Sequence, residues 1–135
     1  MSHLIVDADK GDLEFIISLN KRSMPSVSEL SKERANHLLE ISNYFRILKF
    51  KEESIGFLNA ILPGKGYNSV NYLWFENRYK SYIYVDRIII EKTHQNHGYG
   101  SILYNDLINT INDESLYIGC EINVKPYNVK SINFH

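Results

Sequence analysis

The strongest constraint on the fold of this 135-residue chain is a β-strand followed by a glycine turn and a helix. The run Tyr82–Ile90 consists largely of β-branched and aromatic residues, which predicts a strand. The turn Gln95–Gly100 follows, and then Leu103, Leu107 and Ile111 recur at helical spacing. This order leaves several backbone N–H groups at a helix N-terminus, where the helix dipole also attracts anions. The sequence therefore predicts an anion site suited to a phosphorylated cofactor.

The composition is that of one globular domain with no nucleic-acid partner. Chains of roughly 100–200 residues usually form a single domain, and 44% of these residues are apolar. The formal net charge is −1, and acidic and basic residues are interspersed along the chain. Because no basic patch is visible, we expect no nucleic acid to bind.

The sequence also lacks the patterns of export, membrane insertion and metal binding. Cys120 is the only cysteine, so no internal disulfide can form, which favours a reducing cytoplasm. No run approaches the ~18 apolar residues of a membrane span, and residues 1–10 do not resemble a signal peptide. His94 and His97 show no metal-ligand spacing. We therefore expect a cytoplasmic protein without a membrane partner or a bound metal.

Periodicity and turn residues predict the other elements. They are a helix over 9–19, a helix from the N-cap Ser31 to about Ile41, strands over 44–50 and 54–62, a loop with one short helical turn over 67–80, a strand over 82–90, a helix to about Ile111, a loop over 112–115, a strand over 116–122 and a last helix from about Val129. The strands over 44–50 and 54–62 should form an antiparallel hairpin. The strands over 82–90 and 116–122 should be parallel, because a helix connects them.

The glycine turn by itself fits several kinds of site. A dinucleotide-binding fingerprint needs a third glycine at the position of Leu103. A nucleoside triphosphate loop needs Gly-Lys-Ser/Thr, which does not follow this turn. It also remains open that the two glycines are needed only for the backbone conformation of a tight turn and bind no ligand.

The wider pattern resembles the GNAT superfamily of acetyltransferases. Gln95, Gly98 and Gly100, on a strand–turn–helix, resemble that family's acyl-CoA-binding motif Gln/Arg-x-x-Gly-x-Gly/Ala. The segment from Asn128 to His135 resembles the family's Asn-x-x-Ala-x-x-Leu-Tyr, with histidine at the tyrosine position. A finer likeness, to predicted members of undefined substrate, rests on residues 71–75, 78–79, 85–88, 120–123 and 131–135.

The resemblance covers nearly the whole chain and implies its fold. We expect an α/β (α+β) domain over residues 1–135, with a mixed, mostly antiparallel sheet. It should contain a parallel β-α-β cofactor unit and helices on both faces. Family members continue past the last helix with about two more strands, so we expect a chain that lacks the final strands. An incomplete sheet would leave an unpaired edge, which makes a homodimer an open alternative.

The resemblance also implies which residues hold acetyl-CoA, the expected co-substrate. Gln95 belongs to the motif itself, and the glycines let the main chain approach the pyrophosphate. By this resemblance, the pyrophosphate would be held by the backbone amides of Asn96, His97, Gly98, Tyr99, Gly100 and Ser101. Ile88 and Ile90 would offer main-chain groups to the pantetheine arm, as in strand addition. Asn128 would contact that arm, or else cap the last helix.

Three residues are candidates for the chemistry of acetyl transfer. The amine must be uncharged, the thioester carbonyl polarised and the departing thiolate protonated. Asp86 and Glu121 lie in apolar runs, where burial could make either carboxylate a base; a structural ion pair or hydrogen bond is the alternative for each. His135 could donate the proton to the thiolate, although a terminal residue can also fray.

The resemblance implies an N-acetyltransferase that transfers an acetyl group directly to a primary amine of a small molecule or peptide. The alternative is an acyl-CoA-binding module that is weakly active or inactive and acts within an oligomer. A structural α/β protein with no nucleotide ligand is a third possibility. Aromatic residues could wall the acceptor site or cover the sheet. These are Tyr67, Tyr72, Trp74, Phe75 and Tyr79.

Overall fold

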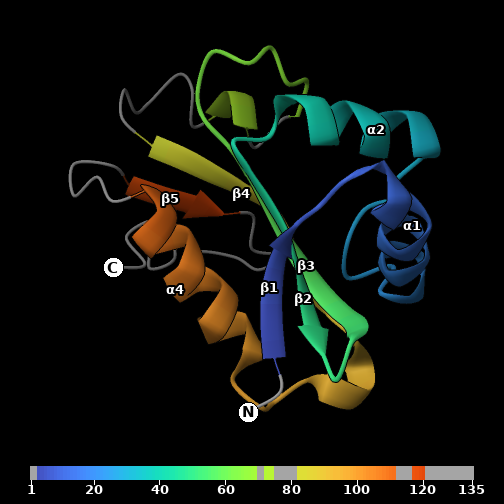
Figure 1. The fold of residues 1–135 in the computed structure, drawn as a ribbon. Coiled ribbons are helices and arrows are strands. Elements are labelled where there is room, and N and C mark those ends of the chain that lie inside the picture. The colour runs from blue at the N-terminus through green and yellow to red at the C-terminus, as the bar shows by residue number, and fades with distance from the viewer. Residues whose placement is uncertain (1–2, 70–71, 75–81, 112–116, 121–135) are drawn as a thin grey trace.

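The computed structural model describes residues 3–69, 72–74, 82–111 and 117–120, the last four as backbone alone. In this part of the chain, strands form one five-stranded sheet in the order β1-β2-β3-β4-β5 (Figure 1). The strands are β1 (His3–Asp7), β2 (Tyr44–Phe50), β3 (Glu53–Ile61), β4 (Tyr82–Ile90) and β5 (Tyr117–Cys120). Neighbours from β1 to β4 are antiparallel, and β5 is parallel to β4. The predicted mixed, mostly antiparallel sheet with a parallel crossover unit is confirmed.

Helices cover both faces of this sheet, as predicted. On one face lie α1 (Leu13–Arg22), preceded by the short 3-10 helix η1 (Lys10–Asp12), and α2 (Lys32–Ile41). On the other face lies α4 (Tyr99–Ile111), and Figure 1 shows the two groups on opposite sides. The core accordingly divides in two. The α1/α2 face buries Ile16, Leu38, Ile47, Phe57 and Tyr84. The α4 face buries Leu48, Leu58, Ile83, Leu103 and Leu107.

The predicted boundaries of the helices and the hairpin hold to within a few residues. Ser31 caps α2, since its Oγ accepts a hydrogen bond from the Arg34 N–H at 3.1 Å. Helix α1 begins four residues later and ends three residues later than predicted. The hairpin of β2 and β3 turns at Lys51 and Glu52, both in the left-handed region. In the segment 67–80, residues 72–74 are helical, while the predicted loop over 112–115 and the helix from Val129 lie outside the described residues.

Strand β1 was absent from the predicted elements, which is a correction. Its five residues pair with β2 from His3↔Phe50 to Asp7↔Arg46. The strand is short and lies at the sheet edge, where Leu4 is 59% exposed. So few residues carry too little alternation to reveal a strand, and pairing with β2 is what orders it.

A β-bulge in β4 changes which side chains share a face. Asn59 of β3 pairs with Arg87, but the next residue of β3 pairs with Val85, so Asp86 is an extra residue in β4. Side chains of a regular strand alternate between faces. The bulge instead places Asp86 and Arg87 together on the α1/α2 face, while Val85 and Ile88 pack on the α4 face. This arrangement follows from the two-against-one pairing of a bulge.

Candidate functional site

The connection from β4 to α4 forms the glycine turn. After β4, the 3-10 helix η2 (Lys92–His94) leads into Gln95, whose Nε2 donates a hydrogen bond to the Ile90 carbonyl oxygen at 2.9 Å. Asn96 and Gly98 then adopt positive φ values of 66° and 82°. These two left-handed residues turn the chain back, so that α4 begins directly after Gly98.

The N-terminus of α4 presents main-chain donors beside open space. The Ile102 N–H donates to the Gly98 carbonyl at 3.1 Å, which closes the first turn of the helix. The N–H groups of Tyr99, Gly100 and Ser101 precede that bond and have no acceptor within the helix. A Cβ built at Gly98 would meet no atom within 4 Å, and one at Gly100 would reach only the Ile88 Cδ1 at 3.9 Å. A ligand oxygen could therefore approach this main chain, so the turn fits a phosphate group.

The C-terminal half of β4 has a main-chain edge beyond its pairing with β5. In the described residues, β5 pairs with Tyr82–Val85, whereas β4 continues to Ile90. Glu91 donates its main-chain N–H to β3 at 2.7 Å, so alternation directs the main-chain groups of Ile88 and Ile90 away from β3. The hydrogen bond from Gln95 reaches the Ile90 carbonyl on that side. The edge of β4 thus leads directly into the glycine turn.

A groove of about 510 Å³ lies alongside this stretch of chain. Leu19, at the end of α1, and Met24 and Val27, in the following loop, line one side. Residues 88–93 and Gln95 line the other side. Its charged groups include an ion pair between Arg22 and Glu91, with Nη1 and Oε2 3.5 Å apart. The groove therefore has a mixed apolar and polar lining and is bordered by the end of β4.

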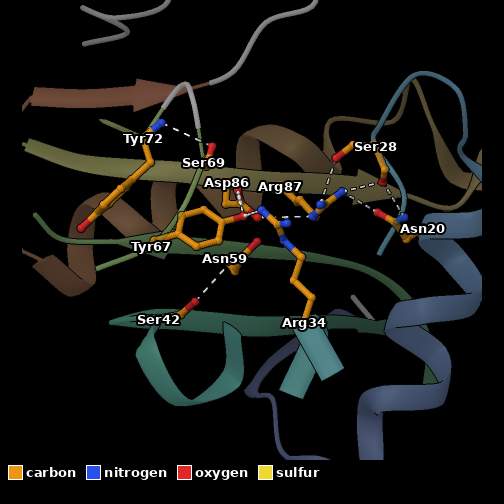
Figure 2. Close-up of polar contacts among 10 residues, drawn as sticks. All are labelled: Asn20, Ser28, Arg34, Ser42, Asn59, Tyr67, Ser69, Tyr72, Asp86 and Arg87. Carbon is orange, nitrogen blue, oxygen red and sulfur yellow. Dashed lines mark hydrogen bonds and ion pairs between the residues drawn. The ribbon is translucent and has the colours of Figure 1, made fainter. Parts of the chain in front are cut away.

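Asp86 lies in a buried polar network (Figure 2), two residues before Ile88, which lines the groove. The Tyr67 hydroxyl donates to Asp86 Oδ1 at 2.8 Å and accepts a hydrogen bond from Arg34 Nη2 at 3.0 Å. The Arg87 Nε lies 3.3 Å from Asp86 Oδ2. Burial raises the pKa of Asp86, and the charge of Arg87 and the hydrogen bond from Tyr67 oppose that rise. Burial also raises the pKa of Tyr67 to about 12, with the charge of Asp86 adding to the effect.

These contacts bear on the predicted role of Asp86 without deciding it. Both carboxylate oxygens face polar groups of the protein, and the residue is 8% exposed. Such contacts are those of the structural ion pair, the alternative that the sequence leaves open. The catalytic role remains a prediction.

Arg87 is a site residue that the sequence did not single out. Its Nη1 donates to the Asn20 Oδ1 and to the Ser28 carbonyl oxygen, both at 2.9 Å, and its Nη2 donates to the Ser28 Oγ at 3.1 Å. Asn20 Nδ2 donates to the same Ser28 carbonyl at 2.9 Å. Figure 2 shows these groups converging from β4, α1 and the loop before α2. The signal that could have revealed Arg87 is an Asp-Arg pair inside an otherwise apolar strand.

Three predicted site residues, Glu121, Asn128 and His135, lie outside the described residues, so their roles stay predictions. Among the described candidates, Tyr99 packs its ring beside Phe50, with ring centroids 6.0 Å apart.

The members of the predicted aromatic cluster differ in burial. Tyr67 and Tyr72 are buried, Trp74 is 37% exposed, and Phe75 and Tyr79 lie outside the described residues.

The described part of the chain has no group of three or more His, Cys, Asp or Glu side chains that could hold a metal ion. No helix within it combines the length and the apolar character that a membrane crossing requires.

Solved structures with a similar fold include several acetyltransferases. Ard1 of Thermoplasma volcanium superposes with a TM-score of 0.70 at 12% identity, over 99% of this chain and 79% of that one. Naa50 of Arabidopsis thaliana, in complex with the bisubstrate analogue CoA-Ac-MVNAL, gives 0.69 at 10% identity, over 97% and 79%. The probable acetyltransferase SA2161 of meticillin-resistant Staphylococcus aureus gives 0.65 at 18% identity, over 96% and 84%. At these identities the likeness shows the fold alone.

The family follows from the sequence itself. A search of curated proteins found no match. The model of the acetyltransferase (GNAT) family, however, matches residues 13–135, which is most of the chain. This match confirms the predicted family, and the solved structures above share the predicted fold. The chain belongs to the GNAT family of acetyltransferases.

Proposed function

We propose that this chain transfers the acetyl group of acetyl-CoA directly to a primary amine of a small molecule or peptide. The observation that carries the proposal is the continuity of main-chain binding groups from the edge of β4, through the glycine turn, to the N-terminus of α4. Such a path suits a ligand with a polar chain at one end and phosphates at the other. The complex of Naa50 with a CoA-containing bisubstrate analogue supports the same assignment.

The phosphate end of acetyl-CoA would bind at the glycine turn. In this proposal the main-chain N–H groups from Asn96 to Ser101 hold the pyrophosphate, with the helix dipole of α4 adding attraction. Gly98 supplies the left-handed turn, and Gly100 supplies the close approach. Gln95 fixes the entry to the turn through its bond to the Ile90 carbonyl.

The pantetheine arm would bind in the groove. Main-chain groups of Ile88 and Ile90 on the edge of β4 would pair with its amides, as an added strand does. The apolar side chains of Leu19, Met24 and Val27 would contact the arm, alongside the polar residues Arg22, Ser23 and Ser26. We also propose that Asn128 contacts the arm.

The chemistry needs a base for the amine and an acid for the thiolate. Acetyl-CoA supplies an acyl group activated as a thioester. The contacts of Asp86 with Tyr67 and Arg87 favour a structural role for it. Of the two candidate bases we therefore propose Glu121, and we propose His135 as the acid.

One observation favours a second candidate, an acyl-CoA-binding module with little or no activity. Among the described residues that line the groove, Glu91 is the one with a carboxylate side chain, and this carboxylate forms an ion pair with Arg22. A base for the amine would therefore have to come from outside the described lining of the groove. Such a module could act within an oligomer, and a homodimer remains a proposal.

Thiol release separates the two candidates. The purified chain is mixed with acetyl-CoA and a panel of primary amines, and free CoA thiol is followed over time. Amine-dependent release supports the acetyltransferase, whereas saturable binding of acetyl-CoA with no release above the amine-free rate supports the binding module. A matched panel of tertiary amines is the control, since these cannot form a stable amide.

A further inference from the structure

We propose that Arg87 is a positioning residue that fixes the loop between α1 and α2 against β4 and thereby shapes the groove. The identity of the groove's ligand rests on the function proposed above. We call the hydrogen bonds that join Arg87 to Asn20 and Ser28 the clamp, and it is inferred from these contacts alone.

The β4 bulge is what brings Arg87 to this position. In a regular strand Arg87 would point to the face opposite Asp86, where α4 buries Leu103 and Leu107. Because Asp86 is an extra residue, Arg87 lies on the α1/α2 face. An arginine in this otherwise apolar strand therefore meets polar partners rather than the apolar core.

The guanidinium of Arg87 is held on several sides. The residue is 6% exposed, and Asn20 is 1% exposed. Nη1 and Nη2 make three hydrogen bonds to Asn20 and Ser28, while Nε faces the Asp86 carboxylate. A buried charge is tolerated only where such partners are fixed, and the planar fork of arginine demands a defined geometry. The contacts therefore fix the position of Ser28 relative to β4.

This clamp connects the two sides of the groove. Ser28 directly follows Val27, which lines the loop side together with Met24. Arg87 directly precedes residues 88–90, which line the strand side. Releasing Ser28 should therefore let the loop move away from the edge of β4. The groove that would bind the pantetheine arm would then change its shape. The glycine turn, which follows Ile90, would keep its conformation.

The clamp is tested first without any ligand. Hydrogen–deuterium exchange is measured on peptides that cover residues 23–31 in wild type, Arg87→Gln and the milder Ser28→Ala. Arg46→Gln is the matched control, because Arg46 pairs with Asp7 and Asp106 away from this loop. We expect exchange to accelerate by about tenfold or more in Arg87→Gln and less in Ser28→Ala. Loop exchange equal to that of the Arg46→Gln control would overturn the clamp.

The effect on the site is tested by calorimetry with two ligands. CoA contains the pantetheine arm, whereas adenosine 3′,5′-diphosphate retains phosphate and lacks the arm. In Arg87→Gln we expect CoA to bind about tenfold more weakly and adenosine 3′,5′-diphosphate to bind with its wild-type affinity. Equal weakening of both ligands, or of neither, would overturn the positioning role. A wild-type protein that binds no CoA would overturn the proposed function instead, and the exchange experiment would still decide the clamp.

Discussion

Asp86 and Arg87 are consecutive in β4, yet both side chains lie on the same face of the sheet, with Arg87 Nε 3.3 Å from Asp86 Oδ2. The bulge that pairs them also shifts the alternation of every later residue in the strand. Ile88 and Ile90 therefore pack toward α4 with their side chains, and Ile89 packs toward α1 and α2. One extra residue thus arranges both the buried network and the end of β4 beside the groove.

Gly98 and Gly100 should respond differently to alanine. Gly98 has a φ of 82° with open space around it, so Gly98→Ala should lower the free energy of unfolding by roughly 1–2 kcal/mol through backbone strain alone. Gly100 has no such φ, so Gly100→Ala should leave that free energy unchanged or raise it by up to about 1 kcal/mol. The family motif also allows alanine at this position, so a bulky residue is needed to block the approach of the phosphate, and Gly100→Leu should weaken acetyl-CoA binding by about tenfold. Urea unfolding and calorimetry measure the two effects, and an unchanged acetyl-CoA affinity in Gly100→Leu would count against the phosphate site.

The ionisation of Asp86 should give the protein a characteristic pH dependence. Burial raises its pKa above the ordinary value of 3.8, so the native state holds this proton more tightly than the unfolded chain does. The stabilisation that results from this shift is fully present at pH values below the pKa of Asp86 in the unfolded chain. It is lost as the pH rises through the pKa of Asp86 in the native state. The free energy of unfolding of wild type minus that of Asp86→Asn should therefore fall as the pH is raised from about 4. Urea unfolding of both proteins across that range checks the sign, and a difference that grows with pH would refute it.

The catalytic candidacy of Asp86 can be checked with the same variant. If its carboxylate serves the structural network, Asp86→Asn should keep its amine-dependent rate of thiol release within about threefold of wild type. Loss of a general base costs about 100-fold or more. A fall of that size at unchanged acetyl-CoA affinity would return the role of base to Asp86.

The Tyr67 hydroxyl should stabilise the network through both of its hydrogen bonds. Tyr67→Phe would leave Arg34 Nη2 and Asp86 Oδ1 without this partner, which should lower the free energy of unfolding by about 1–3 kcal/mol. A double-mutant cycle with Asp86→Asn tests the coupling. We expect the double variant to lose less than the two single losses combined. Strict additivity would mean that the two side chains do not interact.

Local patterns were enough to predict most of the elements and the glycine turn. The repeat of Leu103 and Leu107 marks α4, the turn chemistry at Lys51 and Glu52 separates β2 from β3, and the β-rich run matches β4 as Tyr82–Ile90. Each of these signals depends on residues that are close in the sequence. Local patterns therefore predicted where the chain changes direction and which kind of element follows.

The bulge and the clamp could not be predicted in this way. The bulge exists only in the pairing of β4 with β3, since nothing in the composition of β4 marks Asp86 as the extra residue. Arg87 lies 67 positions from Asn20 and 59 from Ser28. These partners meet through the tertiary fold, so spacing along the chain contains no signal for them. The same holds for β1, which depends on β2 for its order.

The central claim is that the edge of β4 and the N-terminus of α4 together bind acetyl-CoA, and calorimetric titration of the wild-type chain with acetyl-CoA tests it most directly. We expect saturable binding at one site, with a Kd below about 1 mM. Affinity should be weaker for adenosine 3′,5′-diphosphate, which cannot use the edge of β4. An absence of saturable binding at millimolar acetyl-CoA would contradict the claim.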